Sequence, residues 1–132
     1  MKDSPIAFQT TSNLSFDEAV ARVRAALAAE GFGVLTEIDV QATLKKKLDV
    51  DREPYLILGA CHPPSAHRAL TAVPEVGVLL PCNVTVSVED GRTVVRAMDP
   101  ASVMGLVSAP ELAAVGEEIA AKLRRVVDVS RG

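Results

Sequence analysis

The chain has 132 residues, of which 48% are hydrophobic and 23% charged, so we expect one domain over residues 1–132 with a sizeable core. A net charge of -3 with one Tyr, three Phe and no Trp argues against nucleic-acid binding, which needs clustered cations or stacking rings. No run of about 18 apolar residues is present, which argues against a membrane span, and no secretory signal is visible, so we expect a cytoplasmic protein.

The N-terminal part of the chain predicts a strand, a helix and a second strand. Residues 5–11 favour a short strand. Ser15 and Glu18 have the spacing of a capping box that begins a helix, and Gly31 ends this helix because glycine tolerates a left-handed conformation. Its apolar residues recur at helical spacing: Phe16, Val20, Val23 and Leu27. Residues 32–40 then alternate in the pattern of a strand.

The middle of the chain predicts two helical segments and a strand. Residues 43–48 favour a short helical turn with three lysines in solvent. Residues 55–60 favour a strand, and residues 64–72 favour a helix that begins with proline. The stretch after Val73-Pro74 either turns or runs as a strand.

Residues 82–98 predict a β-hairpin. Apolar and polar residues alternate up to Glu89, Asp90-Gly91 is a dipeptide typical of a tight turn, and residues 92–98 return as the second strand. The alternation predicts that one set of side chains is buried, namely Val84, Val86 and Val88. It predicts that the intervening Thr85 and Ser87 are more exposed.

The C-terminal part predicts a short helix after Asp99-Pro100 and a long one that runs to about Val127. Ser108 and Glu111 have the spacing of a second capping box. The long helix carries one apolar stripe: Leu112, Val115, Ile119, Leu123 and Val126. The whole order predicts an α+β fold, a two-layer sandwich whose mostly antiparallel sheet has helices packed on one face. A doubly wound parallel sheet is the alternative, against which the hairpin and the lack of a Gly-rich phosphate loop count.

Two cysteines, each close to proline, are the main candidates for chemistry. Cys61 ends a predicted strand just before a helix, where the helix dipole favours a thiolate. Cys82 shares its strand face with valines, which is typical of a buried cysteine that packs as a small hydrophobe. If residues 82–89 run antiparallel beside residues 55–60, the two thiols lie at the same end of the sheet. If the two strands are parallel, the thiols are about 20 Å apart.

The residues beside the cysteines complete a candidate binding site of Cys61, His62, Cys82 and Asn83. A catalytic Cys–His pair needs an imidazole within reach of a thiol, and Asn83 would then orient it or bind an oxyanion. The spacing matches no cysteine-protease signature. Adjacent Cys61 and His62 do not suit one ion, so we predict no metal site, and we expect His67 to be solvated.

Two acidic residues on a predicted strand are a further candidate site. Glu37 and Asp39 are two positions apart, on the face that the alternation directs to solvent, with Lys45, Lys46 and Lys47 nearby. The pattern favours an exposed patch of ion pairs over a functional site.

Four segments together resemble domain-of-unknown-function family 302: Glu30–Val40, Ile57–Pro63, Leu79–Val84 and Asp99-Pro100. The likeness extends from about Phe16 to Val127. It implies a compact α+β domain and brings no established activity, so no catalytic role is transferred. His62 departs from the family pattern, which usually has Asn after the cysteine.

The sequence is consistent with three hypotheses of function. The first is a module that binds a small ligand or acts in redox chemistry, with a pocket near Cys61 and Cys82. The second is a non-catalytic interaction domain, a homodimer, in which both cysteines are structural. The third is an enzyme with Cys61 as nucleophile. No cofactor is indicated by any motif.

Overall fold

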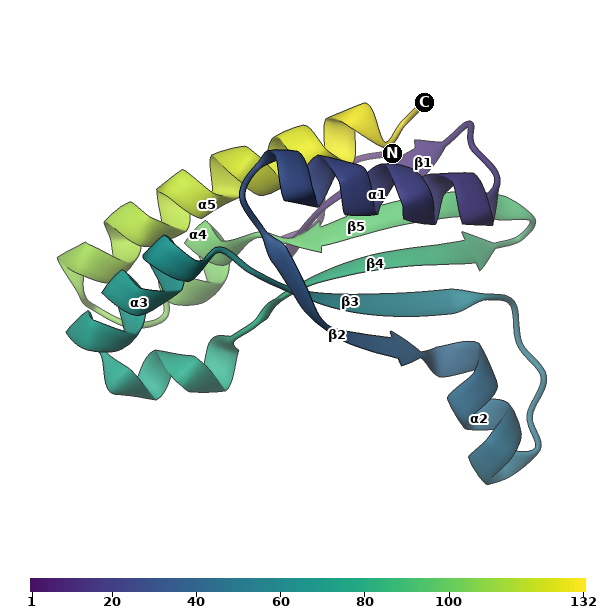
Figure 1. The fold of residues 1–132 in the computed structure, drawn as a ribbon, viewed down its shortest axis with the longest axis horizontal. Coiled ribbons are helices and arrows are strands. Elements are labelled where there is room, and N and C mark those ends of the chain that lie inside the picture. The colour runs from purple at the N-terminus through teal and green to yellow at the C-terminus, as the bar shows by residue number, and fades with distance from the viewer.

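One layer of the molecule is a five-stranded sheet in the order β1-β5-β4-β3-β2, in a computed structural model that describes all of residues 1–132 (Figure 1). Its strands are β1 (Ala7–Ser12), β2 (Gly33–Asp39), β3 (Tyr55–Cys61), β4 (Cys82–Glu89) and β5 (Arg92–Met98). Every neighbouring pair of strands is antiparallel. The predicted α+β fold is therefore confirmed, and the parallel alternative was wrong.

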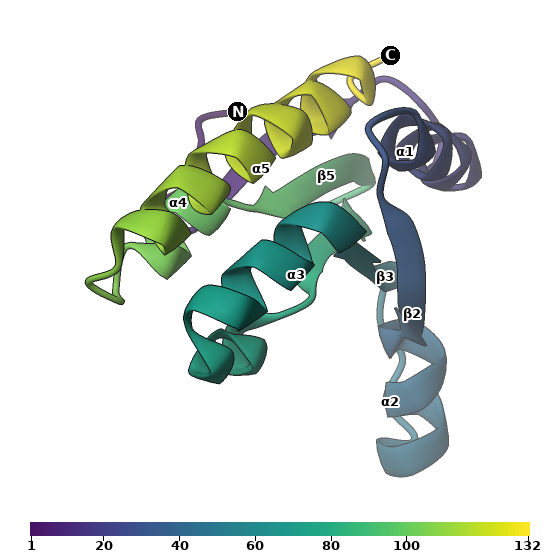
Figure 2. The ribbon, with the colours of Figure 1, turned by 60° about the vertical axis from the view of Figure 1, so that its left-hand side comes forward.

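The second layer consists of helices on one side of this sheet. The helices are α1 (Phe16–Ala29), α2 (Val40–Leu48), α3 (Pro63–Ala72), α4 (Pro100–Met104) and α5 (Pro110–Val129), with a 3-10 helix η1 (Pro74–Leu79). Figures 1 and 2 show α1, α3, α4 and α5 on the same side, while α2 projects from the end of β2. The stretch after α3 is thus helical, not a strand. No helix is long and apolar enough to span a membrane.

The core lies between the sheet and the helices, and α5 contributes most to it. All five residues of the predicted stripe on α5 are buried: Leu112, Val115, Ile119, Leu123 and Val126. The helix packs on α1, α3, β1 and β5. Burying an apolar stripe of this length removes it from water, which is the main force that holds the helix to the sheet.

Of the two predicted capping boxes, one forms and one does not. The Ser15 hydroxyl accepts from the Glu18 backbone N–H at 3.2 Å, and the Ser15 N–H donates to the Glu18 carboxylate at 3.1 Å. At α5 the prediction was wrong, because the N-cap is Ala109, not Ser108, and no side chain caps the helix. Pro110 takes the first helical position, for which its fixed φ is suited, and this moves the helix start one residue onward.

The β4–β5 hairpin has the predicted turn, with a different burial pattern. Asp90 and Gly91 have φ of 53° and 77°, as a tight hairpin turn with two left-handed residues requires. Val84 and Val86 are buried as predicted, but Val88 is only half-buried and Ser87 is 0% exposed. Ser87 is on the face without helices, where its hydroxyl donates to Glu89 at 2.7 Å and the Glu89–Arg96 pair lies nearby.

The edge strand β2 departs from simple alternation. A bulge between Val34 and Thr36 shifts the register, so Glu37 pairs with Leu58 and Asp39 with Leu56, both of which point into the core. The predicted face of the two acidic residues was therefore wrong, although both are exposed as predicted. Glu37 forms an ion pair with Arg24 of α1 at 2.8 Å, and Asp39 caps α2, while Lys45 pairs with residues after its own helix.

Candidate functional site

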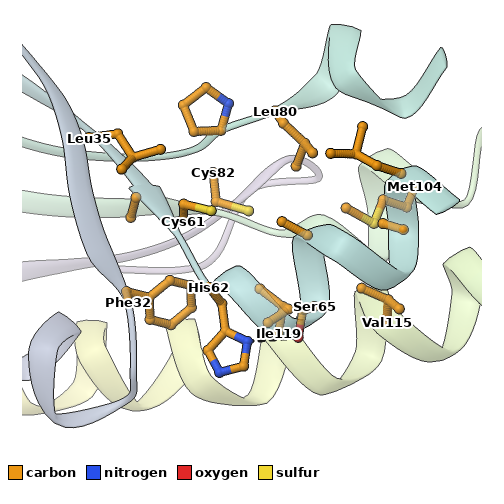
Figure 3. Close-up of a pocket in the computed structure, with 15 residues that line it drawn as sticks. Phe32, Leu35, Cys61, His62, Ser65, Leu80, Cys82, Met104, Val115 and Ile119 are labelled. Carbon is orange, nitrogen blue, oxygen red and sulfur yellow. Dashed lines mark hydrogen bonds between the residues drawn. The ribbon is translucent and has the colours of Figure 1, made fainter. Parts of the chain in front are cut away.

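An apolar pocket of about 290 Å³ lies where β3 ends and β4 begins (Figure 3). Twelve of its fifteen lining residues are hydrophobic, and none is Asp, Glu, Lys or Arg. The sheet edge, α3, α4 and α5 all contribute walls, for example Phe32, Leu35, Ala66, Ala69, Met104 and Ile119. Pockets of this size and composition are typical of small-molecule sites.

The local sequence explains why the sheet opens here. Strand β3 ends at Cys61 because His62 is the N-cap of α3 and the next two residues, Pro63 and Pro64, occupy the first helical turn. Proline cannot donate a ladder hydrogen bond, so the strand cannot continue. On the neighbouring strand, Pro81 precedes β4 in the same way. The two chain breaks lie side by side and leave space for the pocket.

The register brings the two cysteines together at this end of the sheet. Ala60 pairs with Cys82 across the antiparallel β3–β4 ladder, so Cys61 is one position beyond the partner of Cys82. Cross-strand partners are about 5 Å apart and one residue adds about 3.3 Å along the strand, which places the two cysteine Cα atoms about 6 Å apart. Of the two arrangements left open by the sequence, the structure has the one with neighbouring thiols.

The two thiols differ in their surroundings, although both line the pocket. Cys82 is 5% exposed and belongs to the core cluster, whereas Cys61 is half-buried; both are free thiols. Burial, with a smaller contribution from Cys61, raises the pKa of Cys82 to about 11, so this thiol is protonated at neutral pH. Neither thiol has a hydrogen-bond partner among the polar groups around it.

His62 lines the pocket but is not directed at a thiol. Its Nδ1 lies 2.8 Å from the Ser65 hydroxyl, and its ring meets the Phe32 ring edge-on at a centroid distance of 5.5 Å. In Figure 3 the imidazole is turned away from the two sulfur atoms and lies beside Ser65. Burial lowers the pKa of His62, Lys122 on α5 lowers it further, and Glu118 opposes both. The ring therefore favours its neutral form.

The remaining candidates lie outside the pocket. Asn83 is exposed, pairs with Gly59 in the β3–β4 register, and is not part of the lining, so the structure does not bring it to the thiols. His67 is exposed on α3. No group of three or more His, Cys, Asp or Glu side chains is arranged to hold a metal ion.

Several pocket residues cannot be identified from the sequence because they are ordinary apolar residues. Leu70 of α3, Met104 of α4 and Ile119 of α5 line the same pocket as Cys82 only because three helices pack on the sheet. The apolar stripe of α5 identified Ile119 as a core residue, but no local signal indicates that its neighbours leave a cavity.

The chain matches a family model described as "Domain of unknown function DUF302" over residues 8–129. It belongs to the DUF302 family. The resemblance inferred from the sequence is thus confirmed, and the match includes every strand and helix that forms the pocket of this DUF302 domain.

A solved structure shares this fold over nearly its whole length. It is described as "Crystal structure of uncharacterized conserved protein DUF302 from Bacillus stearothermophilus". That protein is 30% identical to this chain, and the match covers 95% of this chain and 98% of the other with a TM-score of 0.88. A comparison with curated proteins gives no match.

Proposed function

We propose that this DUF302 domain binds a small, uncharged apolar ligand in the pocket beside Cys61 and Cys82. The observation that carries the proposal is the lining of the 290 Å³ cavity, in which twelve of fifteen residues are hydrophobic. Apolar cavities of about half that volume bind single-ring hydrocarbons in other proteins. A molecule with one or two rings, or a short aliphatic chain, fits the space.

The absence of charged partners selects the class of ligand. No Asp, Glu, Lys or Arg lines the pocket, and His62 Nδ1 shares a hydrogen bond with the Ser65 hydroxyl. A charged ligand group would lose its hydration without compensation in such a cavity, which is costly. An apolar molecule gains about 25 cal/mol for each Å² of apolar surface removed from water.

The rim of the pocket supports entry of an apolar molecule from solvent. Leu35, in the bulge of β2, is 67% exposed, and Leu70 of α3 is 41% exposed, although both also line the pocket. An exposed apolar rim continuous with an apolar cavity attracts hydrophobic molecules. Closure of these two side chains over a bound ligand would hide apolar surface on both partners.

The experiment is a titration of the protein with a neutral naphthalene-based dye whose fluorescence rises in apolar surroundings. Ala66 lines the pocket and Ala72 is an exposed residue of the same helix outside it, so Ala66→Phe and Ala72→Phe form a matched pair. We expect saturable binding that Ala66→Phe reduces by about tenfold or more, a free-energy loss of about 1.4 kcal/mol, and that Ala72→Phe preserves. Equal binding by both variants contradicts the proposal.

A homodimeric interaction domain is the second candidate. Strand β2 is an edge of the sheet, and Leu35 and Ile38 on it are exposed. An edge with unpaired backbone groups and exposed apolar side chains favours pairing with another strand. Sedimentation analysis of the native chain and of Ile38→Lys tests this candidate, which requires a native dimer that the substitution dissociates. A native monomer excludes it.

A further inference from the structure

We propose that the same pocket carries out thiol–disulfide exchange on a small apolar disulfide, with Cys61 as the attacking thiol and Cys82 as the resolving thiol. This inference rests on the proposed binding of apolar ligands in the pocket. It adds the class of ligand, a disulfide, and a reaction.

The arrangement of the two thiols provides the first support. Both line the cavity, and the β3–β4 register places their Cα atoms about 6 Å apart, within the range of about 4.4–6.8 Å that disulfides require. Figure 3 shows both sulfur atoms in the same part of the pocket. Cys82 is 5% exposed and has no hydrogen-bond partner, so its thiol is a buried polar group directed into the cavity.

The different exposure of the thiols assigns their roles. Cys61 is half-buried and accessible to a molecule that enters the pocket, whereas Cys82, which also lines the pocket, is only 5% exposed. Because burial keeps the Cys82 thiol protonated, it does not compete for the incoming disulfide. It reacts only when a mixed disulfide on Cys61 presents a sulfur atom next to it.

The surroundings favour disulfides over carbonyl compounds as electrophiles. Addition of a thiol to a carbonyl group places negative charge on oxygen, which needs N–H donors. Of the first four residues of α3, Pro63 and Pro64 have no N–H and the N–H of Ala66 is taken by the His62 carbonyl, which leaves a single N–H, that of Ser65. Thiol–disulfide exchange keeps the charge on sulfur, so it depends far less on such donors.

The reaction balances with the disulfide as the oxidant. The Cys61 thiol loses its proton to solvent, its thiolate attacks one sulfur of R–S–S–R, the S–S bond breaks, and the first R–S⁻ leaves and takes a proton from solvent. The Cys82 thiol then gives its proton to solvent and attacks the Cys61 sulfur, which releases the second R–S⁻ to take a proton in turn. In total one disulfide is reduced to two R–SH, and two protein thiols become one Cys61–Cys82 disulfide.

The test uses 4,4′-dithiodipyridine, a neutral aromatic disulfide whose thiopyridone product absorbs light, and oxidised glutathione as the charged reference. We expect the native reduced protein to release two thiopyridones per chain and to lose the mass of two hydrogen atoms. Cys82→Ala should release one thiopyridone and retain one pyridylthio group. Cys61→Ala should react only after denaturation, and circular dichroism confirms that both variants fold.

Selectivity shows whether the pocket takes part. With rates divided by those of free N-acetylcysteine, native protein should prefer the apolar disulfide over oxidised glutathione by at least about tenfold, or about 1.4 kcal/mol in barrier. Ala66→Phe should remove the preference and Ala72→Phe should retain it. A native product with two pyridylthio groups, or a Cys61→Ala variant as fast as native protein, overturns the inference.

These outcomes separate the inference from the function on which it rests. If the naphthalene dye binds with the expected sensitivity to Ala66→Phe but no Cys61–Cys82 disulfide forms, the exchange reaction is wrong and ligand binding stands. If the dye does not bind, the proposed function fails. If a Cys61–Cys82 disulfide forms without a preference for the apolar disulfide over oxidised glutathione, the two cysteines are only an ordinary accessible thiol pair. This result also overturns the inference.

Discussion

Gly59 of β3 and Pro81, which precedes β4, pack so closely that a methyl group on Gly59 would come within 2.9 Å of the proline Cγ. The same methyl group would lie 2.1 Å from the Thr36 hydroxyl on β2. A residue without a side chain therefore lets Pro81 rest against β3. Because Pro81 lines the pocket, this contact connects the packing of three strands to the shape of the site.

Substitution of Gly59 by Ala should destabilise the protein and disturb the pocket. Thr36 can rotate, but the proline ring has little freedom, so we expect a loss of about 1–3 kcal/mol from overpacking. Gly33→Ala is the control, because a Cβ at Gly33 meets nothing within 4 Å. Urea unfolding measures both variants. Equal stability of Gly59→Ala and Gly33→Ala would show that Pro81 moves away from the added methyl group without a cost in free energy.

Alkylation of the native protein should separate the two cysteines. Iodoacetamide reacts with thiolates, and Cys82 is both buried and held protonated by a pKa raised to about 11. At pH 8 we expect carbamidomethylation of Cys61 alone, and of both residues in denaturant. Peptide mass spectrometry locates the label. Native labelling of Cys82 at the rate of Cys61 contradicts the burial on which its role depends.

Replacement of Ile119 by Ala tests whether α5 holds the wall of the pocket. Ile119 is 3% exposed, belongs to the core and lines the cavity. Removal of its buried atoms should cost about 2–5 kcal/mol in the free energy of unfolding, towards the lower end because one side already faces empty space. The exposed Glu117 on the same helix serves as control, where Ala should change stability by about 0.5 kcal/mol or less. A similarly small loss in the free energy of unfolding for Ile119→Ala would show that α5 is peripheral to the core.

The stability that Glu89 confers should depend on pH. A hydrogen bond from Arg96, helped by one from Ser87, lowers the pKa of Glu89 from 4.5 to about 2. A carboxyl with a lowered folded-state pKa stabilises the fold above its unfolded pKa, and this contribution disappears as pH falls from about 4.5 to about 2. At pH 7 the free energy of unfolding of the native protein should exceed that of Glu89→Gln by on the order of 1 kcal/mol. The difference is this small because the Glu89–Arg96 pair is partly exposed to solvent.

The control for this pH dependence is Glu75→Gln, at an exposed residue without an ion pair. Urea unfolding at pH 7, 5, 4 and 3 should show the difference between native protein and Glu89→Gln shrinking across the acid range. The Glu75 variant should follow the native protein throughout. A difference at Glu89 that is constant with pH would show that the Arg96 contact does not depend on the charge of the carboxylate.

Local signals in the sequence predicted most of the fold. The Ser15 capping box, the Asp90-Gly91 turn and the stripe on α5 each depend on residues that are neighbours in the chain, and all three are present. The predictions were wrong where a single residue changed the structure that the surrounding sequence pattern favours. Pro110 displaced the cap from Ser108, and the bulge at Leu35 reversed the faces of the rest of β2.

The candidate site was predicted only in part, because it depends on contacts between distant segments. The prolines beside Cys61 and Cys82 indicated two chain breaks, but only the antiparallel pairing of β3 with β4 makes them neighbours. Asn83 is a candidate from the sequence because it follows Cys82, but the alternation of β4 turns its side chain to solvent. The walls from α3, α4 and α5 are apolar residues whose role appears only after packing.

The most direct test of the central claim is NMR of the methionine methyl groups during titration with an uncharged naphthalene ligand. Of the three methionines, Met104 is buried and lines the pocket, whereas Met1 and Met98 lie outside it and serve as internal controls. We expect a saturable shift of the Met104 signal, weakened in Ala66→Phe, with the other two unchanged. An unmoved Met104 signal at ligand saturation, or equal shifts of all three, would contradict a ligand site beside Cys61 and Cys82.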